Sequence, residues 1–187
     1  MSHETGHGSG HEASHERHRR EGPGSVRVAV VTASDSRGEA EDTSGAFLRS
    51  AAAAAGHPVV LYRVVKDEPE ALRAAVADAL AAGAQAVLVN GGTGIAGRDR
   101  TYEAVAGLLE KRLDGFGELF RMLSWGEIGS AAMMSRAVAG ACRGAALFSM
   151  PGSTAAVRLA WEKLIAPELR HVVRELGKDA APARPPP

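Results

Sequence analysis

AVLVNGGTGIAGRDRTYEAV, residues 86–105, passes from an apolar run through a glycine-rich loop into a segment with helical spacing. Short apolar runs bounded by turn residues are typical of strands buried on both faces, so residues 86–89 predict such a strand. Gly92, Gly94 and Gly97 have the G-x-G-x-x-G spacing of dinucleotide-binding loops. The loop is therefore a nicotinamide or flavin site, a phosphate cradle of another kind, or a tight turn.

The segments before and after this loop repeat the alternation of strand and helix. β-branched runs predict the strands, and apolar residues on one helical face predict the helices. We expect Thr43 or Ser44 to cap the first helix and Pro69 to lie in the first turn of the second. The expected strands are 26–34, 58–65 and 86–89, and the expected helices are 43–56, 69–83 and 101–113. This order predicts an α/β fold with a parallel sheet, helices on both faces, and ligands bound beyond the carboxyl ends of the strands.

The second half of the chain is less regular. Residues 115–129 predict a helix interrupted by glycines, and we expect two short strands around residues 142–144. Residues 157–176 predict a long amphipathic helix that Pro167 bends.

The composition excludes several classes of function. The 22 basic and 22 acidic residues balance, so no bulk field attracts nucleic acid or anionic lipid. Aromatic residues make up 4% of the chain, which removes the stacking platforms of single-strand binders. Cys142 is the only cysteine, so a disulfide within the chain and a thiolate zinc cluster are excluded. No apolar segment reaches the roughly 20 residues of a membrane span, and we expect a soluble, cytoplasmic protein.

The two ends of the chain differ from its middle. Residues 1–25 hold five of the seven histidines among Gly, Ser and Glu, and residues 179–187 are Pro-rich. Neither end can bury a core, so we expect both to be disordered around one domain at residues 26–178. Histidines recur every four residues at His3, His7, His11 and His15. The flanking Gly and Ser favour a disordered tail with weak metal affinity over a dedicated metal site.

Two common interpretations of the glycine loop fail. A Rossmann loop follows the first strand and precedes, by about 20 residues, an acidic residue at the end of the next strand. This loop follows the third expected strand, and the candidate Asp114 follows a helix. A P-loop ends in Lys-Ser or Lys-Thr, and this loop does not. A run of glycine N–H groups with Thr93 and Arg98 nearby suits a phosphate cradle.

Asp67 and Asp99 present a choice between metal binding and helix capping. A carboxylate beside an anion cradle repels the ligand unless a cation bridges them, and Mg²⁺ bound by Asp99 and phosphate oxygens resolves the conflict. The expected sheet places both aspartates at one crevice. Each also lies just before an expected helix, where capping is an ordinary role. The residues alone leave both interpretations open.

The other polar turns have ordinary explanations. Asp42 lies just before the first expected helix, where it is a turn or cap residue. Ser153 or Thr154 begins a helix after a strand, which makes either an anion site or a common strand-to-helix turn. A Ser/His/Asp hydrolase is unsupported, because no G-x-S-x-G elbow exists and the histidines of the folded part lie elsewhere.

Five segments of the chain carry more information together than the glycine loop does alone. They are SDSRGEAEDTSG (34–45), KDEPEALRAAV (66–76), NGGTGIAGRDRTYEA (90–104), GFGELFRMLSWGEIGSAAMMSRAVAG (115–140) and MPGSTAAVRLAWEKLI (150–165). In this order the sequence resembles the MoaB/MogA family of molybdenum cofactor biosynthesis proteins over residues 26–173. The DTSG and PGST forms look more like the MoaB branch.

The resemblance implies a three-layer αβα molybdopterin-binding fold with a mostly parallel sheet. It also implies a homotrimer or a dimer of trimers, and other enzymes of the molybdenum cofactor pathway as partners. Catalytic members adenylylate molybdopterin: the terminal phosphate of the pterin attacks the α-phosphate of Mg-ATP, and pyrophosphate leaves. The ligands are then ATP, molybdopterin and Mg²⁺. By motif, the two important aspartates of the family fall on Asp67 and Asp99, as catalytic residues and Mg²⁺ ligands.

The resemblance also assigns binding residues on two sides of the glycine loop. The nucleotide and phosphate side is implied at Gly91, Gly92, Thr93, Gly94 and Arg98, and the pterin side at Glu118, Ser135, Arg136, Pro151, Gly152 and Ser153. The chain departs from the usual family pattern at Asn90, where Thr is usual, and at Tyr102, where Pro is usual. Neither departure removes a proposed catalytic group.

Two functions follow from these residues. The first is adenylylation of molybdopterin, which needs both aspartates and the glycine loop, and the sequence keeps all of them. The second is a non-catalytic molybdopterin-binding or carrier protein of the same pathway. Phosphoryl-type transfer needs positioning and charge neutralisation more than a nucleophilic side chain, which agrees with the absence of a triad.

Overall fold

Strand β1 (Val28–Ala33) has all six of its residues buried. Successive side chains of a strand point to opposite faces, and here Val28 and Val30 pack in one core cluster while Ala29 and Val31 pack in another. The sheet is therefore covered on both faces, as the unbroken apolar run predicts. The computed structural model describes residues 23–97 and 99–178. Apart from residues 23–25, the ends expected to be disordered lie outside the described residues.

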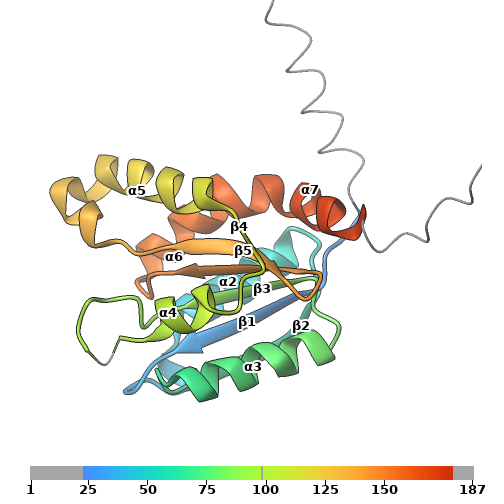
Figure 1. Ribbon diagram of the computed structural model, residues 1–187, viewed down its shortest axis with the longest axis horizontal. Helices are drawn as coiled ribbons and strands as arrows, with labels where there is room; N and C mark the ends of the chain where they lie inside the picture. Colours follow the sequence, from blue (N-terminus) through green and yellow to red (C-terminus); the bar gives the residue numbers. More distant parts are fainter. Residues whose placement is uncertain (1–22, 98, 179–187) are drawn as a thin grey trace, which may run out of the picture.

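The described chain forms a six-stranded sheet in the order β2-β1-β3-β6-β5-β4 (Figure 1). The other strands are β2 (Val59–Val65), β3 (Ala86–Asn90), β4 (Lys111–Arg112), β5 (Val138–Cys142) and β6 (Ala145–Met150). β1 pairs in parallel with β2 and β3, and β3 pairs in parallel with β6. β5 pairs antiparallel with both β4 and β6, so it runs opposite to the other strands of the described sheet. The mostly parallel α/β sheet expected from the sequence is confirmed.

Helices form a layer on each face of the sheet. The helical elements are η1 (Glu39–Glu41), α2 (Thr43–Ala54), α3 (Pro69–Ala81), α4 (Thr101–Ala106), α5 (Asp114–Ile128), η2 (Gly129–Met134), α6 (Thr154–Ala160), η3 (Trp161–Ile165) and α7 (Ala166–Gly177). One core cluster joins the sheet to α2, α5, α6 and α7, and the other joins it to α3 and α4. Figure 1 shows α5 and α7 on one side of the sheet and α3 and α4 on the other. The three-layer arrangement is confirmed.

The helix expected over 101–113 is shorter, because α4 ends at Ala106 and the chain then forms β4. Lys111 pairs with Ala141 and Arg112 with Gly140. A Cβ on Gly140 would overlap the carbonyl oxygen of Lys111, so the close approach of the two strands requires glycine there. A two-residue, exposed and charged strand has no apolar pattern, which is why the sequence did not indicate it.

Two further expectations need correction. Thr43 and Ser44 do not cap α2, whereas the cap role that the sequence also offered for Asp42 is confirmed: its Oδ1 accepts a hydrogen bond of 2.9 Å from the Gly45 N–H. The long C-terminal helix is irregular before Pro167, in the π-helical segment Trp161–Ile165, and Pro167 itself lies in the first turn of α7. Proline has no N–H to donate, so the regular α-helical bonding cannot run unbroken through this region.

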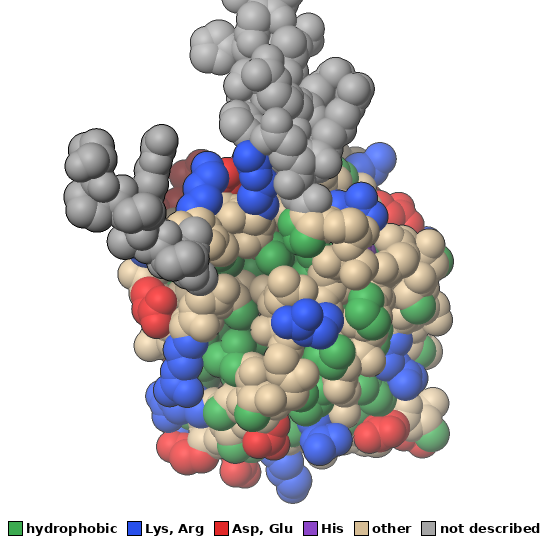
Figure 2. Space-filling view, turned by 90° about the vertical axis from the view of Figure 1, so that its right-hand side faces the viewer, with side chains coloured by type: hydrophobic (Ala, Val, Ile, Leu, Met, Phe, Trp, Pro, Cys, Tyr) green, Lys and Arg blue, Asp and Glu red, His purple; other side chains and the backbone are tan. Residues whose placement is uncertain are grey.

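Charges are mixed over the surface. On the face that Figure 2 draws, Lys and Arg side chains stand among Asp and Glu side chains. This mixture agrees with the balanced composition. In the described part of the chain, no helix is long and apolar enough to cross a membrane.

Candidate functional site

The turns after β1, β3 and β6 meet at a cavity of about 430 Å³. Its walls come from the glycine loop Gly91–Gly94, the turn Pro151–Ser153, Ser135, Asp99 and Arg37. The structure therefore brings together most of the residues implied for the nucleotide and pterin sides. Ligands of open α/β sheets bind at this end of the strands.

The glycine loop is shaped by close contacts that exclude side chains. Gly91 and Gly92 have positive φ values of 96° and 58°. A Cβ on Gly91 would overlap the Ala33 carbonyl oxygen, and a Cβ on Gly92 would overlap the Asp67 carboxylate and the Thr101 hydroxyl. A Cβ on Gly152 would lie 2.8 Å from the Gly91 Cα. Backbone thus packs directly on backbone and on a carboxylate, which leaves the cavity side of the loop open to a ligand.

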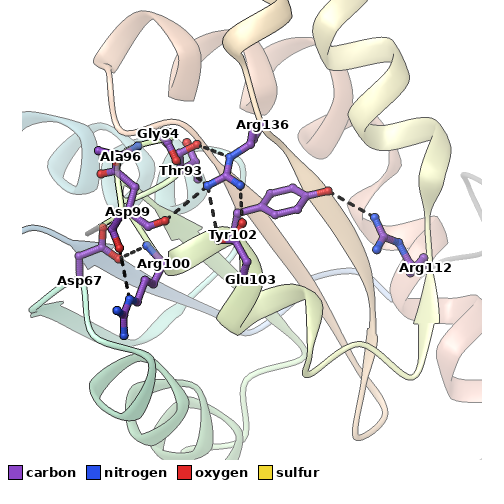
Figure 3. Close-up of polar contacts among 11 residues, drawn as sticks. Asp67, Thr93, Gly94, Ala96, Asp99, Arg100, Tyr102, Glu103, Arg112 and Arg136 are labelled. Atoms are coloured by element: carbon purple, nitrogen blue, oxygen red, sulfur yellow. Dashed lines mark hydrogen bonds and ion pairs between the residues drawn. The ribbon is translucent and has the colours of Figure 1, made fainter.

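Asp67 is buried and fixes the start of α4 (Figure 3). Its Oδ1 accepts hydrogen bonds from the Thr101 hydroxyl at 2.7 Å and from the Arg100 N–H at 3.4 Å. The capping interpretation is wrong for this residue, because Glu68 is the N-cap residue of α3. Burial first, and then the charges of Asp99 and Asp35, raise the pKa of the Asp67 carboxyl, although its two hydrogen bonds act in the opposite direction.

Asp99 is partly exposed and belongs to the glycine loop. Its Oδ2 accepts a hydrogen bond of 3.0 Å from the Ala96 N–H, and the N-cap residue of α4 is Arg100, so Asp99 does not cap that helix. Asp99 lines the 430 Å³ cavity, whereas Asp67 lines a separate cavity of about 460 Å³ with Glu68 and Arg100. The charge of Asp99 helps to raise the pKa of Asp67, but the two carboxylates line different cavities.

Arg136 holds the glycine loop from its other side (Figure 3). Its Nε donates to the Thr93 carbonyl at 2.8 Å, and its Nη2 donates to the Gly94 carbonyl and, at 3.5 Å, to the Asp99 carbonyl. Its Nη1 is bonded to the Glu103 carboxylate, which lowers the pKa of Glu103. The structure thus places Arg136, implied as a pterin-binding residue, in contact with backbone carbonyls of the loop.

The two departures from the family pattern have clear places. The Tyr102 ring lies under the Arg136 guanidinium, with 4.8 Å between the guanidinium carbon and the ring centre, and its hydroxyl accepts a hydrogen bond of 3.4 Å from Arg112. A proline could make neither contact. Asn90 is fully buried and donates to the Thr32 hydroxyl at 2.8 Å, while its Oδ1 has no hydrogen-bond partner among the described residues.

One implied site residue, Glu118, lies apart from this group, and another, Arg98, lies outside the described residues. Glu118 lines a different cavity, of about 170 Å³, with Tyr102, Arg112 and Arg121. Ser153 caps α6 by accepting a hydrogen bond of 3.3 Å from the Ala156 N–H, which confirms it at a helix N-terminus.

Arg37 is a site residue that the sequence analysis missed. It follows β1 and lines the 430 Å³ cavity with the glycine loop. In the sequence it stands in a polar turn and shows no motif of its own, so only its position after a buried strand of a parallel sheet could have indicated it.

Asp67 and Asp99 offer the oxygen ligands that Mg²⁺ prefers, but they line different cavities in this structure. Mg²⁺ takes oxygen ligands and is usually bound by one or two carboxylates together with substrate phosphates and water. Burial, together with the charges of Asp99 and Asp35, raises the pKa of Asp67, and a cation bound beside this carboxylate would offset those effects. No group of three or more His, Cys, Asp or Glu side chains that could hold a metal occurs within residues 23–97 and 99–178. Phosphate oxygens of a ligand would therefore have to complete the coordination.

Comparisons with known proteins agree on one family. A family model described as a probable molybdopterin binding domain matches residues 26–171. Molybdenum cofactor biosynthesis protein B of Bacillus subtilis (strain 168) is 54% identical over 164 residues, which cover 87% of this chain and 96% of that protein. The protein of the same name from Escherichia coli (strain K12) is 49% identical over 145 residues, which cover 77% of this chain and 85% of that protein.

Solved structures show the same relationship. A crystal structure of molybdenum cofactor biosynthesis protein B has a TM-score of 0.80 at 51% identity and covers 83% of this chain and 98% of its own. The tungsten cofactor synthesizing protein MoaB from Pyrococcus furiosus has a TM-score of 0.78 at 36% identity and covers 82% of this chain and 98% of its own. The chain therefore belongs to the MoaB/MogA family of molybdenum cofactor biosynthesis proteins.

Proposed function

We propose that this protein acts in molybdenum cofactor biosynthesis and adenylylates molybdopterin with Mg-ATP. The observation that carries the proposal is the glycine loop: its first two residues must lack side chains, and carboxylates lie against it at Gly92 and Gly94. High identity to proteins named for molybdenum cofactor biosynthesis supports the pathway. Release of pyrophosphate from ATP by attack of the pterin phosphate is the reaction that this arrangement supports best.

The residues of this chain would divide the work between orientation and charge. Backbone N–H groups of Gly92–Gly94 and the N-terminus of α6 at Ser153 would orient phosphate oxygens, whereas the Gly91 N–H already donates to the Met150 carbonyl at 3.1 Å. Asp67 and Asp99 would hold Mg²⁺, which when bound neutralises the charge that develops on the transferred phosphoryl group. Arg136 would keep the loop carbonyls turned away from the ligand, since it holds those of Thr93 and Gly94.

The test is formation of the adenylate by the purified full-length protein. Molybdopterin, ATP and Mg²⁺ are expected to yield adenylylated molybdopterin and one equivalent of pyrophosphate. Asp99→Ala is expected to stop turnover. Asp78→Ala is the matched control, because Asp78 is an exposed acid on α3 that lies outside the linings of the two cavities that hold Asp67 and Asp99. Pterin binding by the wild-type protein without any adenylate would refute the proposal.

One observation favours the carrier function as an alternative. Asp67 and Asp99 line different cavities in the structure, so the metal site needs a ligand or a movement to bring them together. A carrier would bind molybdopterin and pass it to another enzyme of the pathway without using ATP. Calorimetry with Mg-ATP alone and with molybdopterin alone separates the two functions, because only the enzyme binds both.

We also propose a homo-oligomer, a trimer or a dimer of trimers, assembled through α5 and η2. Large apolar side chains are exposed there at Leu119, Met122, Trp125, Ile128, Met133 and Met134. Those on α5 recur every three residues, so successive ones are neighbours on the helix surface and the stripe winds about half-way around the helix from Leu119 to Ile128. An exposed apolar stripe of this kind on a single chain marks an interface. The proposed occupant is a second copy of this chain, because closed symmetric assembly covers such a stripe in every copy.

Light scattering tests this assembly. Trp125→Lys is expected to lower the molar mass toward that of one chain, since Trp125 is 64% exposed in the stripe. Leu113→Lys, at an exposed apolar residue before the stripe begins, is the control and is expected to leave the mass unchanged. A wild-type protein that runs as a single chain would rule the proposal out.

A further inference from the structure

Arg37 is held over the glycine-loop cavity by its own turn. The Ser34 hydroxyl oxygen accepts hydrogen bonds from the Arg37 N–H at 3.0 Å and from the Arg37 Nε at 3.4 Å. A Cβ on Gly152 would lie 3.6 Å from the Arg37 Nη2, so the end of the guanidinium lies beside that turn. The side chain is therefore anchored at its Nε while its terminal nitrogens reach the cavity wall.

The charges around this cavity single out Arg37. Among the described residues that line it, Arg37 is the only basic side chain and Asp99 the only acidic one. Within the described part of the chain, no carboxylate lies within ion-pair distance of Arg37. Arg136 differs, because its guanidinium is bonded to loop carbonyls and to Glu103. An arginine whose terminal N–H groups lack an acidic partner among the described residues, on a cavity lined by the glycine loop, is suited to an anion.

We propose that the terminal nitrogens of Arg37 bind a phosphate group of the ligand held over Gly91–Gly94. This inference rests on the proposed function, because it requires the ligand to be a phosphate ester or a nucleotide. Guanidinium binds two phosphate oxygens at once, which would fix the orientation of the phosphate as well as its charge. Asp99 on the same cavity disfavours a bare anion, so Arg37 and a bound Mg²⁺ together would balance the site.

Ser34 is then a positioning residue that acts through Arg37. Loss of its hydroxyl would leave the guanidinium charged but free to rotate. A lysine at position 37 would keep the charge but would lose both the Nε anchor to Ser34 and the paired contact with phosphate. Arg37→Ala, Arg37→Lys and Ser34→Ala thus separate charge, fork geometry and anchoring.

The experiment is calorimetric titration of the full-length protein with inorganic pyrophosphate, with and without Mg²⁺, at low and high salt. Arg37→Ala is expected to weaken binding about tenfold or more, the scale of one charge-assisted paired contact, and to flatten the salt dependence. The pyrophosphate affinities of Arg37→Lys and Ser34→Ala are expected to lie between those of Arg37→Ala and the wild type. Arg63→Ala is the control, because Arg63 is exposed on β2 and donates only to the neighbouring Tyr62 carbonyl.

The outcomes distinguish this inference from the proposed function. Equal pyrophosphate affinity in Arg37→Ala and wild type, or no binding by the wild type, overturns the role of Arg37. Should Arg37→Ala fail to fold by thermal unfolding, Arg37→Gln replaces it with the same expected loss. A loss confined to the Arg37 and Ser34 variants, in a wild-type protein that forms no adenylate, supports the anion site and overturns the proposed reaction. If Arg37→Ala instead forms adenylate with an unchanged KM for molybdopterin and an unchanged pyrophosphate affinity, the proposed reaction is supported and the role of Arg37 is overturned.

Discussion

The first half of the glycine loop, Gly91–Gly94, and its second half, Ile95–Gly97, are held very differently. Side chains added at Gly91, Gly92 or Gly94 would overlap backbone or a carboxylate, whereas nothing lies within 4 Å of a Cβ on Gly97. Ile95 is 69% exposed. The G-x-G-x-x-G spacing thus joins two closely packed glycines, Gly92 and Gly94, to a third, Gly97, that has open space around it.

The largest effect is expected from Gly92→Ala in the first half. The φ of 58° and the overlap with Asp67 and Thr101 both oppose a Cβ. We expect the free energy of unfolding to fall by about 2–4 kcal/mol, because left-handed backbone costs about 1–2 kcal/mol and overpacking about 1–3 kcal/mol. Urea unfolding measures this loss, and adenylate formation should disappear with it. A loss below about 1 kcal/mol would mean that the close packing of the first half has little energetic weight.

The next effect concerns the clamp on the first half. Arg136→Ala removes the donors to the Thr93 and Gly94 carbonyls. It is expected to lower the free energy of unfolding by about 1.5–3 kcal/mol, the scale of hydrogen bonds to a charged group. Hydrogen exchange of the loop amides should speed up while that of α3 stays unchanged. Arg136→Lys should restore the stability and the slow loop exchange only in part, because an ammonium group lacks the planar, paired N–H donors of the guanidinium. Unchanged loop exchange in Arg136→Ala would show that the loop is rigid without its clamp.

Asp67→Asn is expected to act in the opposite direction on stability. The pKa of Asp67 is raised in the folded protein, so its ionisation at neutral pH costs stability, and that cost vanishes below the ordinary carboxyl pKa. Asparagine keeps an oxygen that can accept the hydrogen bond from Thr101. We expect Asp67→Asn to raise the free energy of unfolding at pH 7, by less than Arg136→Ala lowers it, and to stop adenylate formation. The gain should shrink as the pH is lowered to 4. Destabilisation at pH 7 would show that the carboxylate is needed for the fold itself.

The smallest effect is expected from Gly97→Ala in the second half. The φ of this glycine is not positive, and the space around it is open. The free energy of unfolding should therefore change by no more than about 0.5 kcal/mol. It is also the matched control for Gly92→Ala. A large loss in stability would erase the distinction between the two halves.

Local patterns were sufficient for the first part of the fold. β1, β2, β3, α2 and α3 follow from β-branched runs and helical spacing, and their order implies the parallel sheet. β4 could not be predicted, because Lys111 and Arg112 carry no apolar signal and form a strand only where β5 offers Gly140. The early end of α4 follows from the same pairing.

The site was predictable in its components but not in its contacts. Resemblance indicated Asp67, Asp99 and the loop glycines, yet it could not show that Asp67 bonds to Thr101 instead of capping α3. It also could not show that Arg136 faces carbonyls while Arg37 faces the cavity. Which arginine has donors left for a ligand depends on distances between segments far apart in the sequence.

The π-helical segment Trp161–Ile165 sets the phase of the C-terminal helix. Buried residues recur at steps of four, at Val157, Trp161, Ile165, Leu169 and Val173. Each such step overshoots an α-helical turn by about 40°, so the stripe would drift by about 160° and leave the sheet. One turn with an extra residue returns about 100° of that drift. If this segment took regular α-helical bonding with the same number of residues, Leu169 and Val173 would rotate by about 100° away from the sheet. Deletion of one residue here would instead restore an α-helical turn and keep both side chains on the sheet, so the π-helical turn, and not any side chain, sets the orientation of the end of this helix.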